Sequence, residues 1–349
     1  MDAKPVAGKR GKKSRRITLD DVAAAAGVSL STASRALAGE KGVRLEIREK
    51  VLAAAKQVNY TVSANLAGSQ VILAASSAAM LDYVRNQFTL YVLEGLKDRA
   101  ATLGLDVVQR AVADTQDEKQ LLEEARNDPA VSGLLFLTVD DEAMLAATRD
   151  FSKPVILLNG HDPSMRLSSV TPSNRSAARV AAEHLIGLGH RRILFLMRPG
   201  RRTIVHRMEG WQDALKARGL QVDDDLVVTV DDWLPELAAD AIAKRISERG
   251  QDFTAILTAG DSLALGAILG VQRTGLSVPG DVSVVGMDDL PQAAFFNPPL
   301  TTMHLPMREI GAVGLDLLRD AAAGMVYPAR RVELACHLIE RSSTAPPKD

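Results

Sequence analysis

Residues 17–60 read ITLDDVAAAAGVSLSTASRALAGEKGVRLEIREKVLAAAKQVNY, and they predict short helices with a tight turn between the first two. Thr18 and Asp21 have the spacing of a capping box, so we expect the first helix to begin there and to include the alanines that follow. Gly27 can adopt the positive φ that ends a helix, and Ser29 is a suitable N-cap for the next one. The segment therefore begins as helix, turn and helix.

A second and a third helix complete a small module. We expect the second over about Leu30–Ala38 and the third over about Leu45–Asn59. A helix, a turn containing Gly and another helix are typical of a helix-turn-helix. Apolar residues of the third helix recur at helical spacing and can close a miniature core; they are Ile47, Val51, Ala54 and Val58.

Charge is distributed unevenly along the chain. Residues 1–60 hold 13 Lys or Arg and 6 Asp or Glu, whereas the whole chain has a net charge of −1, which leaves −8 for residues 61–349. Such asymmetry indicates contact with nucleic acid at the basic end. We expect residues 1–16 to be a disordered basic tail, either merely solvated or also in contact with DNA. For residues 17–60 the helical pattern favours binding of double-stranded DNA.

The second helix supplies the candidate readers of DNA sequence, because in such modules its N-terminal part meets base edges in the major groove. Arg35 can bind guanine O6 and N7 together, and Leu30 can contact a thymine methyl group. The candidate base readers are Leu30, Ser31 and Arg35, and the residues suited to phosphate oxygens, which position the module, are Thr18, Thr32 and Ser34.

Several motifs resemble those of the LacI/GalR family of bacterial transcriptional repressors. The run from residue 18 is T-L-D-D-V-A-x-x-A-G-V-S-x-S-T-x-S-R-x-L, followed by V-R-x-x-x-R-E-K-V and N-Y. Further motifs are E-H-L-I-G-L-G-H-R-R-I at 183–193, R-x-x-G-W at 207–211, A-L-G-A at 264–267, V-P-G-D-V-S-V-V-G-M-D-D at 278–289 and P-P-L-T-T at 298–302. The resemblance covers about residues 17 to 340 and implies a DNA-binding repressor.

The predicted hinge, residues 61–70, departs from the family pattern. That pattern has Pro-Asn after the Tyr, then Ala-Arg, and a Leu nine residues on that wedges into the minor groove. Here Tyr60 is followed by TVSANLAGSQ, so either the hinge is shorter and its wedge is Leu66, or Ser69 occupies the Leu position. The resemblance adds Leu66 and Arg44 to the DNA-binding candidates; Arg44 stands where an N-capping Ser is common.

After residue 70 short apolar strands alternate with helices, such as those expected at Phe88–Leu103 and Ser176–Leu188. This order predicts parallel sheets covered on both faces. The resemblance implies two lobes like those of type-I periplasmic sugar-binding proteins, with the chain crossing between them near 168–172, 300 and 325–332. The expected strands form two sets: 71–76, 105–109, 133–139 and 154–159, then 191–197, 226–230, 255–259 and 281–287.

Composition restricts the class of protein. The chain of 349 residues fits several domains, has no apolar run of 18 residues and has no secretory signal pattern. Its single cysteine, Cys336, excludes a disulfide framework and a Cys-rich metal site. We therefore expect a cytoplasmic protein without cofactor, metal or membrane partner. After the tail, the module at 17–60 and the hinge, we expect a two-lobed effector-binding and dimerisation domain at 71–341 and a tail at 342–349.

Candidate ligand-binding residues follow the predicted strands, because ligands of open α/β sheets bind beyond the carboxyl ends of the strands. Thr203 and Arg207 lie four residues apart and share a helix face. Trp233 and Arg207 could instead serve packing or an ion pair, and Asp261 could be a helix N-cap. Carboxylate, guanidinium, amide and aromatic groups suit a polyhydroxylated ligand; the candidates are Phe88, Asn159, Thr203, Arg207, Trp233, Asp261 and Asp288.

The resemblance implies effector contacts at Asn159, Thr203, Arg207, Trp233 and Asp288, and adds Arg201, which matches a position used by purine-binding members. Phe88 matches the first of two adjacent aromatic residues in those members, but Thr89 replaces the second. Gly260 stands where Asn often contacts sugar. These departures disfavour a purine or a lactose-like ligand and favour another sugar, sugar acid or polyol.

The leading hypothesis is a repressor that a small carbohydrate-like effector releases from its operator. We expect a homodimer and a pseudo-palindromic operator. The effector could instead act as a co-repressor, or the chain could be a cytoplasmic sugar-binding protein with weakened DNA binding. An enzyme is disfavoured, because adjacent carboxylates such as Asp288 and Asp289 point to opposite sides of an extended chain and no nucleophile motif is present.

Overall fold

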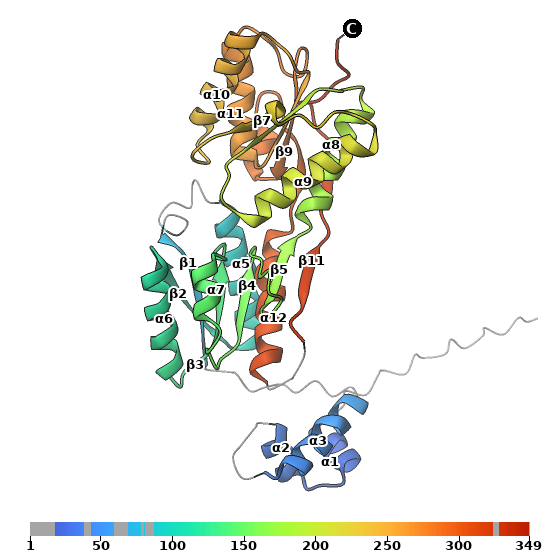
Figure 1. Ribbon diagram of the computed structural model, residues 1–349. Helices are drawn as coiled ribbons and strands as arrows, with labels where there is room; N and C mark the ends of the chain where they lie inside the picture. Colours follow the sequence, from blue (N-terminus) through green and yellow to red (C-terminus); the bar gives the residue numbers. More distant parts are fainter. Residues whose placement is uncertain are drawn as a thin grey trace, which may run out of the picture. The chain divides into compact units, whose positions relative to one another are not determined.

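The computed structural model describes residues 18–37, 43–58, 69–77, 80, 87–323 and 328–348. It divides into a body that contains the first three helices and a body that contains both sheets, and each is described by itself. Figure 1 labels many of the elements in both bodies. The predicted tail at 1–16, Tyr60 and Leu66 lie outside the described residues.

The helix-turn-helix is confirmed. Its helices are α1 (Leu19–Ala26), α2 (Leu30–Leu37) and α3 (Leu45–Gln57). The Asp21 carboxylate accepts hydrogen bonds from the Thr18 amide (2.8 Å) and the Thr18 hydroxyl (2.9 Å), which holds the start of α1. Gly27 ends that helix with φ of 62°, and the Ser29 hydroxyl accepts from the Thr32 amide at 3.1 Å. The local signals read from the sequence therefore act as expected.

The three helices enclose a core of small apolar side chains. Val22, Ala33 and Val51 come from the three different helices, and none of them has exposed surface. Ala54 belongs to the same core, and Ile47 and Val58 pack against it. The predicted inner face of α3 is therefore confirmed, and the opposite faces of the short helices are left for other contacts.

The first lobe is built on a six-stranded parallel sheet in the order β11-β5-β4-β3-β1-β2. Four of the strands were predicted, whereas β5 and β11 were not. The bounds are β1 (Gln70–Ser76), β2 (Asp106–Val112), β3 (Val131–Leu137), β4 (Val155–Leu158), β5 (Ser168–Pro172) and β11 (Arg331–Leu334).

The second lobe repeats this plan with the order β12-β10-β9-β8-β6-β7, and only its edge strand β12 is antiparallel to its neighbour. The sequence did not predict β10 or β12. The bounds are β6 (Ile193–Met197), β7 (Val227–Thr229), β8 (Ala255–Thr258), β9 (Ser283–Asp288), β10 (Thr301–His304) and β12 (His337–Ile339). The predicted two-lobed α/β fold is confirmed.

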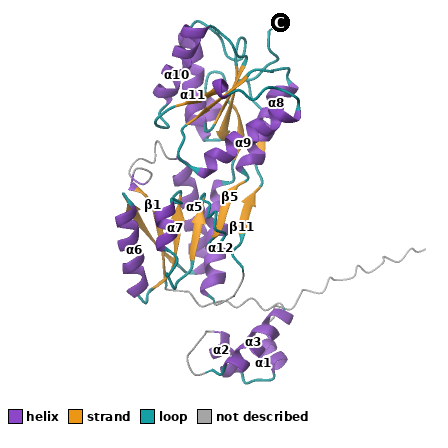
Figure 2. Ribbon diagram, in the orientation of Figure 1, coloured by secondary structure: helices purple, strands orange, loops and turns teal. Residues whose placement is uncertain are grey.

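Helices cover the sheets, as Figure 2 shows by the purple helices beside the orange strands. In β3, Leu135 and Leu137 enter one core, whereas Leu134 and Phe136 enter another, because successive side chains of a strand point to opposite faces. The helices are α5 (Gln87–Leu103), α6 (Thr115–Asn127), α7 (Glu142–Ala147), α8 (Asn174–Gly187), α9 (Arg202–Ala217), α10 (Pro235–Arg249), α11 (Asp261–Arg273) and α12 (Met307–Ala322), with the 3-10 helices η1 (Asp224–Leu226) and η2 (Pro291–Phe295).

The chain passes three times between the lobes. It leaves β5 of the first sheet for α8, returns from β10 of the second sheet to α12, and passes from β11 to β12. The crossings therefore lie at about 172–174, 304–307 and 334–337, a few residues later than the sequence predicted. The shift arises because the segments expected to cross at 168–172 and 325–332 include β5 and the start of β11.

Residues 343–345, which the sequence assigned to a tail, pack on the second sheet. Ser343 has no exposed surface, and its hydroxyl accepts from the Thr301 amide (2.8 Å) and donates to the Val284 carbonyl oxygen (2.6 Å). Buried His190 lies 2.9 Å from the Ala345 carbonyl oxygen through Nε2. These residues therefore form part of the second lobe.

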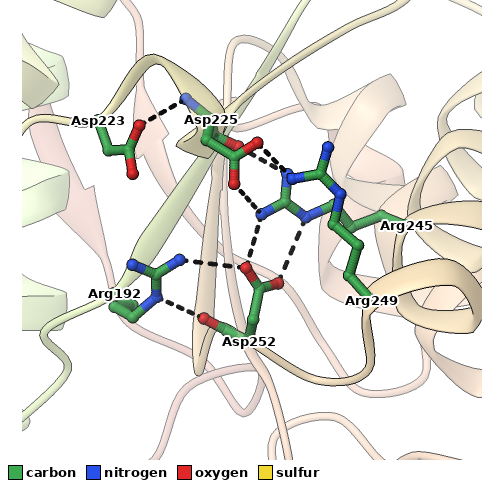
Figure 3. A network of polar contacts seen from close by, with 6 residues as sticks. All are labelled: Arg192, Asp223, Asp225, Arg245, Arg249 and Asp252. Atoms are coloured by element: carbon green, nitrogen blue, oxygen red, sulfur yellow. Dashed lines mark hydrogen bonds and ion pairs between the residues drawn. The ribbon is translucent and has the colours of Figure 1, made fainter.

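A network of ion pairs stabilises the second lobe at the amino ends of its strands (Figure 3). Arg245 of α10 lies 2.7 Å from Asp252 and 3.1 Å from Asp225, and Arg192 binds Asp252 at 3.1 Å. Although burial opposes it, hydrogen bonds from Arg245 and Arg192 hold the pKa of Asp252 below its ordinary value. Because ligands of such sheets bind at the opposite strand ends, we assign this network a structural role.

Glycines allow helix pairs in both lobes to approach closely. A Cβ on Gly311 of α12 would lie 2.2 Å from the Val92 carbonyl oxygen of α5, and one on Gly266 of α11 would lie 2.1 Å from that of Pro235 in α10. Gly210 of α9 makes the same kind of contact with α8, since its Cβ would lie 2.0 Å from the Arg175 carbonyl oxygen. The obstacle in each case is backbone, which cannot rotate away.

We expect Gly210→Ala to lower the free energy of unfolding by about 3 kcal/mol, because the new methyl group forces α8 and α9 apart. Chemical denaturation of the full chain would measure the loss. Gly187→Ala is the matched control, since Gly187 ends α8 and nothing lies within 4 Å of its added Cβ. Equal stability of the two variants would contradict the packing argument.

No helix in the described part of the chain is long and apolar enough to span a membrane.

Candidate functional site

The exposed face of α2 carries the predicted base readers. Leu30 is 47% exposed, although it is a large apolar residue, and Ser31 and Arg35 are exposed as well. Ala33 and Leu37 of the same helix are buried against α1 and α3. The helical period therefore directs Ala33 and Leu37 inward and the candidate readers outward.

The residues expected to contact phosphates lie around this face. Thr18 and Ser34 are exposed, and Arg44 is exposed immediately before α3. Thr32 is half-buried, and its hydroxyl lies 2.8 Å from that of Ser29. Leu66, the remaining candidate for DNA contact, lies outside the described residues.

The candidate ligand-binding residues come from the carboxyl ends of strands in both lobes. Asn159 directly follows β4 of the first sheet, whereas Asp288 ends β9 of the second. The first turn of α9, which carries Arg201 and Thr203, follows β6. We call the set Asn159, Arg201, Thr203, Arg207, Trp233 and Asp288 the inter-lobe site.

Arg207 is the most constrained cation of the inter-lobe site, with only 4% of its surface exposed. Its Nε donates to Asn174 Oδ1 (2.8 Å), and its Nη1 donates to the Ala259 carbonyl oxygen (2.5 Å) and lies 3.7 Å from Asp288 Oδ1. Burial lowers the pKa of Arg207, and the charge of Asp288 opposes that effect. The guanidinium is therefore fixed in one orientation beside Asp288.

Asp288 is held beside an aromatic ring. Burial raises the pKa of Asp288 to about 7, and the nearby Arg207 opposes the rise. A Cβ on Gly260 would lie 3.2 Å from the Trp233 ring and 3.3 Å from the Asp288 carboxylate. Ring and carboxylate therefore both lie close to this glycine.

Arg201 connects the two lobes. Its Nη2 donates to the Asn159 backbone carbonyl oxygen at 2.7 Å. Burial lowers the pKa of Arg201 to about 10, against the attraction of Asp140. Asn159 and Thr203 are 3% and 2% exposed. The structure therefore joins Arg201 to Asn159 and Arg207 to Asp288.

Asp261 and Phe88 are placed differently from the rest. Asp261 has no exposed surface, and its carboxylate accepts from the Leu290 amide (2.8 Å) and the Thr302 hydroxyl (2.6 Å). Burial raises the pKa of Asp261 to about 6. Its carboxylate thus bridges β10 and the loop after β9 and does not cap its own helix. Phe88 is half-buried in the first turn of α5 and packs on the core.

Sequence reasoning missed three polar residues beside the inter-lobe site. Asn174 binds Arg207, and Arg331 Nη2 lies 2.5 Å from Nδ1 of His161. Asn174 follows β5, which the sequence did not predict, and Arg331 begins β11, so a search at the carboxyl ends of strands would not have found it. His161 stands two residues after Asn159 and had no such signal.

Comparison with known proteins supports both halves of this arrangement. Residues 18–63 match the family described as "Bacterial regulatory proteins, lacI family", and residues 182–344 match a "Periplasmic binding protein-like domain". The chain is 32% identical to the HTH-type transcriptional regulator MalR of Streptomyces coelicolor, over 94% of this chain and 96% of that protein. It is 28% identical to the HTH-type transcriptional repressor CytR of Escherichia coli, over 96% and 98% of the two chains.

Two solved structures have the same fold. The complex of the transcriptional regulator CelR with cellobiose has a TM-score of 0.72 at 28% identity, covering 94% of this chain and all of that one. The lac repressor dimer bound to operator and the anti-inducer ONPF has a TM-score of 0.69 at 29% identity, covering 95% and 100%. With a helix-turn-helix followed by two parallel α/β lobes, this chain belongs to the LacI family of bacterial transcriptional regulators.

Proposed function

We propose that the protein is a repressor that binds an operator through α2 and is released by a small carbohydrate-like effector. The observation that carries this proposal is the pair of sites in one chain. Leu30 and Arg35 are exposed on a helix-turn-helix, whereas in the two-lobed domain buried Arg207 of α9 lies beside half-buried Asp288 at the end of β9. One site suits DNA, and the other suits a polyhydroxylated ligand.

In this proposal Leu30, Ser31 and Arg35 meet base edges, with Arg35 binding a guanine. The exposure of all three supports this role. The phosphate contacts fix the register of the helix on the duplex; they come from Thr18, Thr32, Ser34 and Arg44.

The effector would be held by both lobes. Arg207 and Asp288 would share hydrogen bonds with its hydroxyl groups, and Trp233 would cover an apolar face of the sugar ring. Asn159 would contribute from the first lobe. Asp261 is left out, because both of its hydrogen-bonding contacts are within the protein, and Phe88 stays a peripheral candidate.

A two-fold homodimer would match a pseudo-palindromic operator, with one helix-turn-helix for each half-site. The lac repressor, a relative, is a dimer in its complex with operator. The effector can change operator affinity only by its own differential affinity for the two states, typically about 1–3 kcal/mol. CelR, another relative, binds cellobiose, which supports a carbohydrate ligand.

The first test is a fluorescence anisotropy titration of the protein against DNA upstream of its own gene, with excess competitor DNA. Specific binding at about 10⁻⁸ M or tighter is expected, and a panel of sugars added to the complex should contain one that releases it. A sugar that tightens the complex would make the effector a co-repressor. Binding of sugar without preference for any DNA would favour a sugar-binding protein with weakened DNA binding.

A further inference from the structure

Three buried polar atoms of the inter-lobe site have no hydrogen-bond partner in the described part of the chain. They are Asn159 Oδ1, Arg201 Nε and Thr203 Oγ1. Arg201 and Asn159 are also in direct contact, through the bond from Arg201 Nη2 to the Asn159 carbonyl oxygen. Because buried polar groups in folded proteins are almost always paired, these atoms are suited to a group from outside the chain.

The first turn of α9 adds backbone donors to this position. The amides of Ile204 and Val205 already bond to the Arg201 carbonyl oxygen, so in the described part of the chain the donors left at this helix end are the amides of Arg202 and Thr203. The side chain of Arg201, the N-cap, makes no capping hydrogen bond. The α9 helix follows β6, which lies between β7 and β8 where the strand order reverses. Ligands of such sheets bind at this reversal, and the positive end of a helix favours an anion there.

Cationic side chains outnumber carboxylates around this helix end. After burial, the groups that lower the pKa of Arg201 are the charges of Arg207 and Arg198, while Asp140 and Asp288 oppose them. Arg207 is already beside Asp288. The Nε of Arg201 is thus a buried cationic donor without an acceptor of its own.

The first lobe presents more positive charge to the same helix. The guanidinium of Arg331 lies 2.5 Å and 3.1 Å from the two ring nitrogens of His161, whose ring centroid is 5.3 Å from that of His206 in α9. Burial and then the charges of Arg331, His206 and Arg202 lower the pKa of His161. The lowered pKa favours neutral His161, so Arg331 is the cation that the first lobe brings towards α9 through this contact.

We propose that the first turn of α9, with Arg201 and Thr203, binds an anionic group of the effector, which is therefore a carbohydrate carrying a phosphate or a carboxylate. This inference rests on the proposed function, since it names the ligand class of the same site. Arg201 Nε and the amides of Arg202 and Thr203 donate to oxygens of the anion, and Asn159 Oδ1 accepts from a neighbouring hydroxyl group. An uncharged sugar would leave the three cations Arg198, Arg201 and Arg207 facing only the carboxylates of Asp140 and Asp288.

Such an anion would also make the effector bind one arrangement of the two lobes more tightly than another. It would lie between the cations at the start of α9 and Arg331 of the first lobe, so its binding would be strongest when these two groups are close. A ligand shifts a conformational equilibrium only through this kind of difference in affinity.

The test is thermal unfolding of the full chain in increasing sodium phosphate, against sodium chloride at the same pH and ionic strength. Phosphate should raise the unfolding temperature of the natural protein, and Arg201→Gln should weaken this apparent affinity roughly tenfold or more. Arg218→Gln is the matched control: it removes the same charge at the exposed C-terminal end of α9 and should keep the natural response. If Arg201→Gln does not fold, Thr203→Val, which keeps the charge, should weaken the phosphate response.

Equal phosphate protection in Arg201→Gln and Arg218→Gln would overturn the proposal. A second arm compares glucose, gluconate and glucose 6-phosphate by the same measurement. Tighter binding of either anion than of glucose supports the proposal and tells a carboxylate from a phosphate ester, whereas glucose binding as tightly as both anions contradicts it. If none of the three binds, the phosphate titration decides.

The outcome is separable from that of the proposed function. If a neutral sugar releases the operator and phosphate does not raise the unfolding temperature, the protein is still a repressor but the proposed anion site is wrong. If the protein binds no operator specifically, the proposed repressor function is wrong. Protection by phosphate that depends on Arg201 would still support the anion site.

Discussion

Asp288→Asn should raise the effector concentration needed for half-release of the operator by about 100-fold, with unchanged operator affinity. The carboxylate beside Arg207 is the strongest acceptor of the inter-lobe site, and hydrogen bonds to a charged group contribute about 1.5–3 kcal/mol each. The substituted amide keeps the size of the side chain but loses its charge. Titration of the effector into a fluorescent operator complex measures the change.

The effector's affinity should also depend on pH. Burial raises the pKa of Asp288 to about 7, so the carboxylate gains a proton as the pH falls through 7. Because hydroxyl groups of the effector donate to the ionised form, affinity should weaken below pH 7 by up to about tenfold per pH unit. Asp288→Asn should lack this dependence. If the same effector concentration releases Asp288→Asn and the natural protein from the operator, with the same pH dependence, Asp288 does not contact the effector.

The second large effect is expected at the DNA. Arg35→Ala should weaken specific operator binding by about 1–3 kcal/mol, since a bidentate contact with guanine is lost. Binding to competitor DNA should change much less, so the ratio of the two affinities falls. Anisotropy titrations with both DNAs at one salt concentration give that ratio.

Arg44→Ala is the matched comparison for Arg35, because both remove one exposed arginine from the helix-turn-helix. Loss of a phosphate contact should weaken specific and non-specific binding alike and reduce the salt dependence by about one unit of slope. An unchanged affinity ratio in Arg35→Ala would assign base reading to other residues of α2.

Much of the fold could be predicted because local signals coincide with the tertiary structure. The turn at Gly27 and the N-cap at Ser29 appear as expected, and the apolar runs 71–76 and 255–259 became β1 and β8. Edge strands such as β11 and β12 were missed. Their residues are all exposed or half-buried and form no long apolar run, and the two strands are set by pairing with distant β5 and β10.

The candidate site was predictable to a similar extent. Asn159 and Asp288 could be predicted because an apolar strand runs directly into each of them. Asn174 could not be found in this way, since its relevance depends on the guanidinium of Arg207, 33 residues away in sequence. Asp261 follows a strand like the others, but the chain folds Thr302 and the Leu290 amide onto it, which no local pattern indicates.

The glycine contacts between helices have a mechanical consequence. Because Gly311 and Gly210 bring backbone against backbone, the paired helices within each lobe have little room to shift when a ligand binds. We therefore expect a conformational change on ligand binding to occur in the three short crossings between the lobes, at 172–174, 304–307 and 334–337. Each lobe would then rotate as a rigid body about these crossings, so a small movement near Arg201 would produce larger displacements farther from them.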